Sequence, residues 1–158
     1  GEARAIALDI SKAFDKVWHR GLLHKLQAYG VSGKVLAIIE SFLSGRSIKV
    51  VLSGNSSKEH SINAGVPQGS VLGPTLFLIF INDLPDNIFC KLGIFADDTT
   101  LYSSVGRSAG VFEKVELAGD LEADLRCITE WGNRWLVTFN TTKTKLLSIN
   151  RRIHPLPS

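Results

Sequence analysis

The sequence predicts an α/β (α+β) fold, in which an antiparallel sheet of a few strands is backed by helices. Residues 91–102 form two apolar segments with two acids between them, a pattern typical of a strand, a tight turn and a second strand. Residues 19–29, 32–43 and 108–135 carry apolar side chains at helical spacing. With 158 residues, 44% of them hydrophobic, the chain has the size of one domain with a buried core.

The first expected element is a short buried strand over residues 4–9, whose apolar residues end on Asp9. The residues that follow it are too mixed to continue the strand. Helices are then expected over residues 19–29 and 32–43, each followed closely by a glycine. Asp15 is interpreted as a cap or salt-bridge partner for the first of these helices.

Residues 46–52 and 59–62 flank the polar loop 53–57, which predicts a hairpin. A loop punctuated by glycine and proline, residues 64–73, then runs into an apolar segment that is too dense for a one-sided helix. We therefore expect a buried helix there, with Pro74 in its first turn, where its missing N–H costs nothing.

The long helix expected over residues 108–135 has one apolar stripe, and its acids, Asp124 among them, are expected to face away from that stripe. Residues 146–149 would form a closing strand. We assign residues 1–150 to one domain and residues 151–158 to a loose basic tail.

Charge is unevenly distributed about the net value of +3, with basic residues prevailing in 1–58 and acids in 83–130. Basic ends around an acidic centre suit a phosphate backbone at the rim and a metal in the middle. A solvated acidic helix with a basic tail explains part of this pattern equally well. The two cysteines, Cys90 and Cys127, lack metal-ligand spacing and argue against a disulfide framework.

No apolar run reaches the roughly 18 residues of a membrane-spanning helix, and no secretory signal is visible, so no membrane partner is expected. The histidines form no cluster, and all four are assigned to surface or packing positions: His19, His24, His60 and His154.

Three acids are candidates for a metal site: Asp9 at the end of the first strand, and Asp97 and Asp98 at the turn of the later strand pair. Neighbouring carboxylates repel each other and are tolerated best where a cation compensates them. A few carboxylates that leave room for water and phosphates are how proteins usually hold Mg²⁺. Taken singly, each acid also fits a solvated turn, a strand end or a helix cap.

The loop 64–73 supplies a second candidate region. Gly65 and Gly69 allow the backbone to approach a flat or charged ligand closely, and Gln68 offers a donor and an acceptor between them. A purely structural loop before a core helix is the alternative.

Taken together, these segments resemble the palm of a reverse transcriptase, an RNA-directed DNA polymerase, and most closely one from a non-LTR (LINE-like) retrotransposon. Four blocks carry the resemblance in the family's order: residues 8–15, 65–74, 95–98 and 121–145. They cover nearly the whole chain, and four blocks in order are far more specific than any one of them.

The resemblance implies two metal ions, Mg²⁺ with Mn²⁺ as an alternative. Asp9 and Asp97 would be their principal ligands, with the backbone carbonyl of Ile10 as a further oxygen. Asp98 would be a supporting ligand. Lys143 matches a lysine that is often proposed to protonate the leaving pyrophosphate; taken alone, it would be a solvated surface charge.

The resemblance also implies substrate-binding roles for Phe14, Gln68 and Gly69. Phe14 would lie under the incoming sugar, where a flat ring clashes with a 2′-hydroxyl and favours deoxynucleotides; the alternative is a core aromatic. Gln68 would contact the incoming nucleotide.

The implied reaction is attack of a DNA primer 3′-hydroxyl on the α-phosphate of a deoxynucleotide, directed by an RNA template. The fingers and thumb of the family are largely missing, so we expect a fragment of a longer retrotransposon polyprotein that polymerises poorly or not at all by itself. A nuclear location is expected from the family. Two alternatives stay open: a non-catalytic palm that is a relic or a nucleic-acid- or protein-binding scaffold, and a metal-dependent phosphatase or nuclease, which leaves residues 67–69 unexplained.

Overall fold

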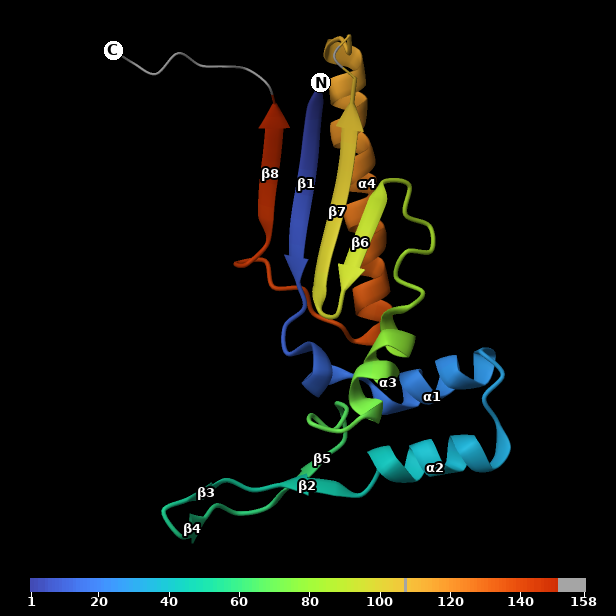
Figure 1. The fold of residues 1–158 in the computed structure, drawn as a ribbon, viewed down its shortest axis with the longest axis vertical. Helices are drawn as coiled ribbons and strands as arrows, with labels where there is room; N and C mark the ends of the chain where they lie inside the picture. Colours follow the sequence, from blue (N-terminus) through green and yellow to red (C-terminus); the bar gives the residue numbers. More distant parts are fainter. Residues whose placement is uncertain (107, 151–158) are drawn as a thin grey trace. The chain divides into compact units, whose positions relative to one another are not determined.

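The computed structural model describes residues 1–106 and 108–150. It has the expected mixed α/β fold, and its residues fall into two compact units (Figure 1). Unit 1 comprises residues 1–11, 84–134 and 138 onwards, and unit 2 comprises residues 12–83 and 135–137. The loose tail expected over residues 151–158 lies outside the described residues.

Unit 1 contains one antiparallel sheet of four strands in the order β6–β7–β1–β8. The four strands are β1 (Glu2–Asp9), β6 (Lys91–Phe95), β7 (Asp98–Val105) and β8 (Lys145–Asn150). The predicted first strand, strand pair and closing strand are thus confirmed. Because β1 and β7 are the two central strands, residues at the start and in the middle of the chain share one strand pair.

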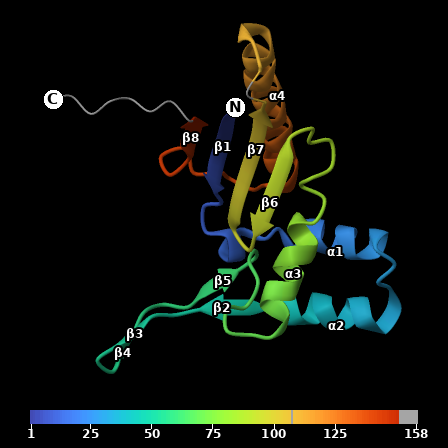
Figure 2. The ribbon, with the colours of Figure 1, turned by 45° about the horizontal axis from the view of Figure 1, so that its top comes forward.

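Helix α4 (Val111–Trp135) lies across one face of this sheet (Figure 1, Figure 2). Side chains alternate between the two faces of a strand, so every second residue of β1 and β7 points toward α4. The buried apolar side chains of this layer are Ile6, Leu8, Leu101, Leu117, Leu121 and Ile128. Among the described residues, no helix of unit 1 covers the opposite face of the sheet.

One expectation about α4 was wrong. Asp124 does not face away from the apolar stripe but is fully buried, at 0% exposure. Its two carboxylate oxygens accept hydrogen bonds from the backbone N–H groups of Phe89, at 3.0 Å, and Cys90, at 2.7 Å. These donors precede β6 and have no strand partner there, so the carboxylate satisfies them in place of a β-ladder.

Unit 2 is mainly helical. Its helices are the short 3-10 turn η1 (Ala13–Lys16), α1 (His19–Ala28), α2 (Gly33–Leu43) and α3 (Leu72–Ile81). The predicted hairpin is present as two short strand pairs, β2 (Arg46–Ile48) with β5 (His60–Ile62), and β3 (Val51–Leu52) with β4 (Asn55–Ser56). Pro74 lies in the first turn of α3, as expected.

A buried lysine joins α1 to the end of α3. The Nζ atom of Lys25 donates to the backbone oxygen of Phe80 at 2.6 Å and to the carboxylate of Asp83. The same ammonium lies 3.8 Å from the ring centroid of Trp135, in cation–π geometry. These contacts satisfy a charge that would otherwise be costly to bury.

Over the described residues, no helix combines the length and the apolar character that crossing a bilayer requires.

Candidate active site

The end of the central strand pair brings two of the predicted acids together. In the antiparallel register of β1 and β7, Asp9 lies directly opposite Asp98. Directly paired residues of such strands have their Cβ atoms about 4.5–5.5 Å apart. Leu8 and Thr99 point into the buried layer, so the neighbouring acids Asp9 and Asp98 belong to the open face of the sheet.

Asp97 lies in the two-residue turn that joins β6 to β7. Phe95 and Asp98 form the last strand pair, and Ala96 and Asp97 connect them. Ala96 has a φ of 54°, a left-handed conformation that costs a residue with a Cβ about 1–2 kcal/mol. Tight hairpin turns demand such positive φ angles. The turn therefore places Asp97, half-buried, one residue before the partner of Asp9.

Lys143 lies over the Asp9 carboxylate. Its Nζ atom is 3.4 Å from both Oδ1 and Oδ2 of Asp9. The side chains are 65% and 28% exposed, respectively, and a pair this open to solvent contributes less than about 1 kcal/mol. The ion pair is thus too weak to set the position of Lys143 by itself.

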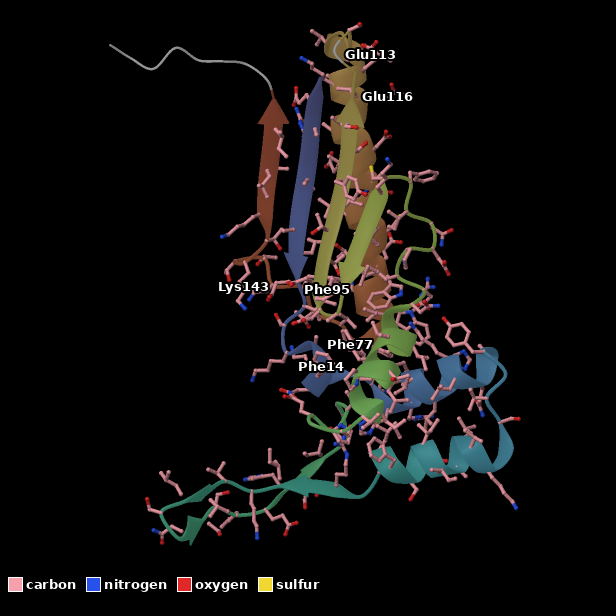
Figure 3. All side chains as sticks on the ribbon, in the orientation of Figure 1. Phe14, Phe77, Phe95, Glu113, Glu116 and Lys143 are labelled. Atoms are coloured by element: carbon pink, nitrogen blue, oxygen red, sulfur yellow. The ribbon has the colours of Figure 1, made fainter. Side chains whose placement is uncertain are left out.

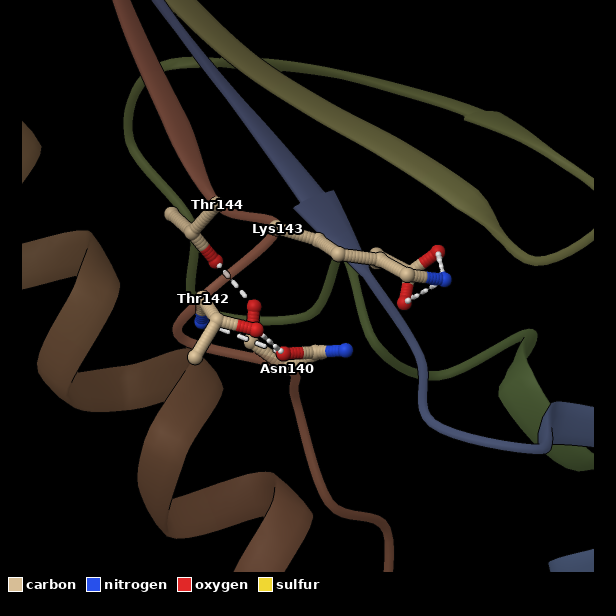
Figure 4. Close-up of polar contacts among 5 residues, drawn as sticks. Asn140, Thr142, Lys143 and Thr144 are labelled. Carbon is tan, nitrogen blue, oxygen red and sulfur yellow. Dashed lines mark hydrogen bonds and ion pairs between the residues drawn. The ribbon is translucent and has the colours of Figure 1, made fainter.

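The loop before β8 provides that position (Figure 4). The side-chain oxygen of Asn140 accepts hydrogen bonds from the N–H of Thr142 at 3.1 Å and from its hydroxyl at 2.7 Å, an Asx turn. The Thr144 hydroxyl donates to the backbone oxygen of Asn140 at 2.9 Å. The N–H of Asn140 in turn donates to the backbone oxygen of Asp9 at 2.8 Å, which ties the loop to the end of β1.

Ile10 follows Asp9 and is buried. It forms an isolated antiparallel bridge with Phe139, made by the N–H of Ser11 donating to Thr138 and the N–H of Asn140 donating to Asp9. Neither of these two bonds uses the Ile10 carbonyl oxygen, the atom that the resemblance names as a metal ligand.

An open pocket of about 510 Å³ covers this end of the sheet. Both acidic and basic side chains line the pocket. Its lining residues are Ala7, Leu8, Asp9, Asp98, Thr142, Lys143 and Lys145. Phe95 and Lys143 both lie at this end of unit 1 (Figure 3). A pocket with carboxylates and ammonium groups side by side suits a phosphate together with the cations that accompany it.

The chemical type of the available ligands, carboxylate oxygens, suits a hard divalent cation such as Mg²⁺. The acids at this edge of the sheet offer carboxylate oxygens, the ligands that Mg²⁺ prefers. Over the described residues, no group of three or more His, Cys, Asp or Glu side chains is close enough to hold a metal ion. The roles of Asp9, Asp97, Asp98 and Ile10 as ligands therefore stay predictions.

In unit 2, the ring of Phe14 packs against Phe77 of α3 (Figure 3). The ring centroids are 4.6 Å apart and the ring planes are inclined by 33°. Phe77 is 2% exposed, whereas Phe14 is half-buried. Phe14 is therefore supported from the core and keeps part of its ring accessible.

Gln68 and Gly69 lie on an exposed loop of the same unit. The Nε2 atom of Gln68 donates to Oδ1 of Asp15 at 2.7 Å. Of the two roles expected for Asp15, the cap of α1 was wrong, because Trp18 occupies that position, and the salt bridge stays a prediction. Gly69 has a φ of 78°, a conformation that favours glycine.

Sequence reasoning missed three residues near these sites. Phe95, next to the acidic turn, is 82% exposed. Its alternation with Lys91 and Gly93 on an exposed strand face was the available signal. His19 and Arg46 contact the backbone oxygen of Gly65, at the start of the Gln68 loop. No local sequence pattern predicts that contact.

A sequence model of the family described as "Reverse transcriptase (RNA-dependent DNA polymerase)" matches residues 1–156. The chain belongs to the reverse transcriptase family. The resemblance predicted from the four sequence blocks is thereby confirmed. Reverse transcriptases generally use divalent metal ions and bind an RNA template and a primer.

Curated relatives are polymerases of insect mobile elements. The chain is 38% identical, over 154 residues, to the RNA-directed DNA polymerase from mobile element jockey of Drosophila funebris, a match that covers 95% of this chain and 16% of that protein. It is 33% identical, over 160 residues, to the probable RNA-directed DNA polymerase from transposon X-element of Drosophila melanogaster, covering 96% and 17%. The chain thus spans about a sixth of the length of these non-LTR retrotransposon relatives.

Two solved telomerase structures share the fold. Apo telomerase from Candida tropicalis superposes with a TM-score of 0.65 at 13% identity, covering 97% of this chain and 32% of that one. Telomerase from Candida albicans, solved with a fragment of telomeric RNA, gives a TM-score of 0.63 at 11% identity, covering 98% and 28%.

Proposed function

We propose that this chain is the palm of an RNA-directed DNA polymerase from a non-LTR retrotransposon. One observation carries the proposal: Asp9 and Asp98 face each other across β1 and β7, with Asp97 in the adjoining turn and Lys143 over Asp9. The reaction is attack of a DNA primer 3′-hydroxyl on the α-phosphate of a deoxynucleotide, directed by an RNA template, with pyrophosphate as the leaving group.

The three carboxylates and the Ile10 carbonyl would hold two Mg²⁺ ions, with Mn²⁺ as an alternative. When bound, such ions stabilise the negative charge on the attacking and leaving oxygens. The chain's contribution is to fix the ligands before substrate arrives. Asp9 and Asp98 are fixed by the β1–β7 ladder, and Asp97 by a tight two-residue turn.

Lys143 would donate a proton to the leaving pyrophosphate. The Asn140–Thr144 loop fixes its backbone, while its long side chain is mostly exposed and is held to Asp9 only by a weak ion pair. Such a side chain can leave Asp9 for a phosphate oxygen at little cost. A positioned general acid of this kind typically contributes a factor of about 10²–10⁴ in rate.

Phe14 and Gln68 would select the nucleotide in unit 2. Phe14, backed by the buried ring of Phe77, is stiff enough to reject a 2′-hydroxyl by contact. Gln68, whose amide N–H is engaged by Asp15, presents its carbonyl oxygen to a ligand, and Gly69 leaves the backbone uncovered beside it.

We further propose that the chain, with a palm over residues 1–150, is part of a longer retrotransposon protein (the parent polymerase) that acts in the nucleus. The relatives are about six times as long as the matched segment, which supports this proposal. RNA template, DNA primer and deoxynucleotide would be the partners of the parent polymerase.

A non-catalytic palm that serves as a nucleic-acid- or protein-binding scaffold is the second candidate. The ion pair between Lys143 and Asp9 fits this candidate, because a lysine beside a predicted metal ligand offsets part of its charge.

Primer extension by the parent polymerase with Asp97→Ala separates the two candidates. We expect the substitution to abolish incorporation of deoxynucleotide on an RNA template in Mg²⁺. Asp86→Ala, at an exposed acid outside the pocket, is the matched control and should retain extension. Retained extension by the Asp97→Ala variant would refute the polymerase assignment.

A further inference from the structure

Two side chains converge on one backbone oxygen at the start of the Gln68 loop. Nε2 of His19 lies 2.7 Å from the carbonyl oxygen of Gly65, and Nη2 of Arg46 lies 2.5 Å from the same atom. A carbonyl oxygen only accepts, so a hydrogen bond from His19 to Gly65 needs the proton on Nε2, an atom that also lies 3.4 Å from Nη2 of Arg46. Arg46 is itself fixed by a second bond, from its Nε to the backbone oxygen of Leu43 at 3.0 Å.

Gly65 is held just as firmly on its other sides. Its N–H donates to the backbone oxygen of Val17 at 2.8 Å, and the N–H of Val66 donates to that of Phe14, also at 2.8 Å. Gly65 has a φ of 81°, and a Cβ at this position would lie 2.6 Å from the backbone oxygen of Asp15. The start of the loop is therefore pressed against the turn that carries Phe14.

The same loop places Gln68 three residues later. The hydroxyl of Ser70 donates to the backbone oxygen of Pro67 at 2.6 Å, which closes the loop locally. Gln68 then reaches back to Asp15, the neighbour of Phe14. The turn at Phe14 and Asp15 is thus bonded both to the start of the loop, through Val66, and to its tip, through Gln68.

We propose that His19 and Arg46 are positioning residues for nucleotide selection, which act by holding the Gly65 carbonyl so that Gln68 and Phe14 keep a fixed spacing. The proposal rests on the function proposed for Gln68 and Phe14. His19 and Arg46 touch the loop backbone and need not touch the nucleotide. Their loss should weaken nucleotide binding and selectivity more than it slows turnover at saturation.

The test compares two variants of the parent polymerase that differ by one methylene. In His19→Gln the side-chain N–H can occupy the place of Nε2, whereas in His19→Asn it is too short to reach Gly65. Steady-state primer extension should show KM for the deoxynucleotide raised about tenfold in His19→Asn, with kcat within about threefold of wild type. His19→Gln should restore KM to within about twofold, and Arg46→Leu should behave like His19→Asn.

His24→Asn is the matched control, since His24 lies on the same helix and its ring contact is with Trp135. It should leave KM unchanged. KM does not depend on the fraction of enzyme that is folded, so partial misfolding of a variant lowers kcat and leaves the comparison intact.

An unchanged KM in both His19→Asn and Arg46→Leu would overturn the inference, as would an equal rise in His24→Asn. A failure of the proposed function has a different signature, because Asp97→Ala would then still extend the primer whatever the His19 variants do.

Discussion

The support of Phe14 by Phe77 makes a quantitative prediction. Phe77→Leu removes the buried ring whose centroid lies 4.6 Å from that of Phe14. Aromatic pairs of this kind contribute about 0.5–1.5 kcal/mol beyond the area that they bury. If Phe14 rejects ribonucleotides by steric contact, that energy bounds the loss of selectivity, because 1.4 kcal/mol corresponds to a factor of about ten. We expect the preference for deoxynucleotide over ribonucleotide to fall by between about twofold and tenfold.

The assay is single-nucleotide extension by the parent polymerase, with kcat/KM measured for a deoxynucleotide and for the matching ribonucleotide. Phe80→Leu is the matched control. Phe80 lies on the same helix and is 1% exposed, but its ring pairs with Trp135, with ring centroids 6.2 Å apart. Both substitutions should lower the free energy of unfolding by similar amounts. An unchanged kcat/KM ratio in Phe77→Leu, or an equal change in Phe80→Leu, would refute the reasoning.

Three further predictions follow from single contacts. Asp124→Ala should lower the free energy of unfolding by about 2 kcal/mol in urea titration, because two backbone N–H groups lose their acceptor. The control Glu122→Ala, on the exposed face of α4, should change it by less than about 0.5 kcal/mol. Burial, and then Asp124, raises the pKa of the Cys90 thiol to about 11 from an ordinary 9.0. In a Cys127→Ser background, alkylation of Cys90 at pH 8.5 should therefore be about 100-fold slower than that of an ordinary thiol. The unfolded chain releases this proton near pH 9 and the folded chain only near pH 11, so this contribution to stability is complete below pH 9 and lost between those values. Lys143→Gln should reduce kcat about 100-fold in primer extension while the free energy of unfolding changes by less than about 1 kcal/mol, and an unchanged kcat would remove Lys143 from the reaction.

Local patterns predicted most of the fold. The apolar run that ends on Asp9 is a strand because its side chains alternate between the helix-covered and open faces. The acids near residue 97 mark a turn because a tight hairpin leaves its tip in solvent. Pro74 marked the start of a helix because proline fits its first turn.

What could not be predicted depends on partners distant in sequence. Asp124 occupies a stripe position between Leu121 and Ile128, and only the unpaired N–H groups before β6 explain an acid there. The contact of His19 with Gly65 joins residues 46 positions apart, and no periodicity in the sequence predicts it. The register of β1 against β7, which sets Asp98 and not Asp97 opposite Asp9, pairs two strands that are distant in the sequence, and no local pattern specifies it.

The most direct test of the metal assignment is a crystal structure of the parent polymerase with primer–template, deoxynucleotide and Mn²⁺, with the ions located by anomalous scattering. We predict two Mn²⁺ peaks bound by the carboxylates of Asp9 and Asp97, with Asp98 beside them and Lys143 moved off Asp9 toward the nucleotide phosphates. Peaks absent from this end of the β1–β7 pair, or bound by other side chains, would contradict the account.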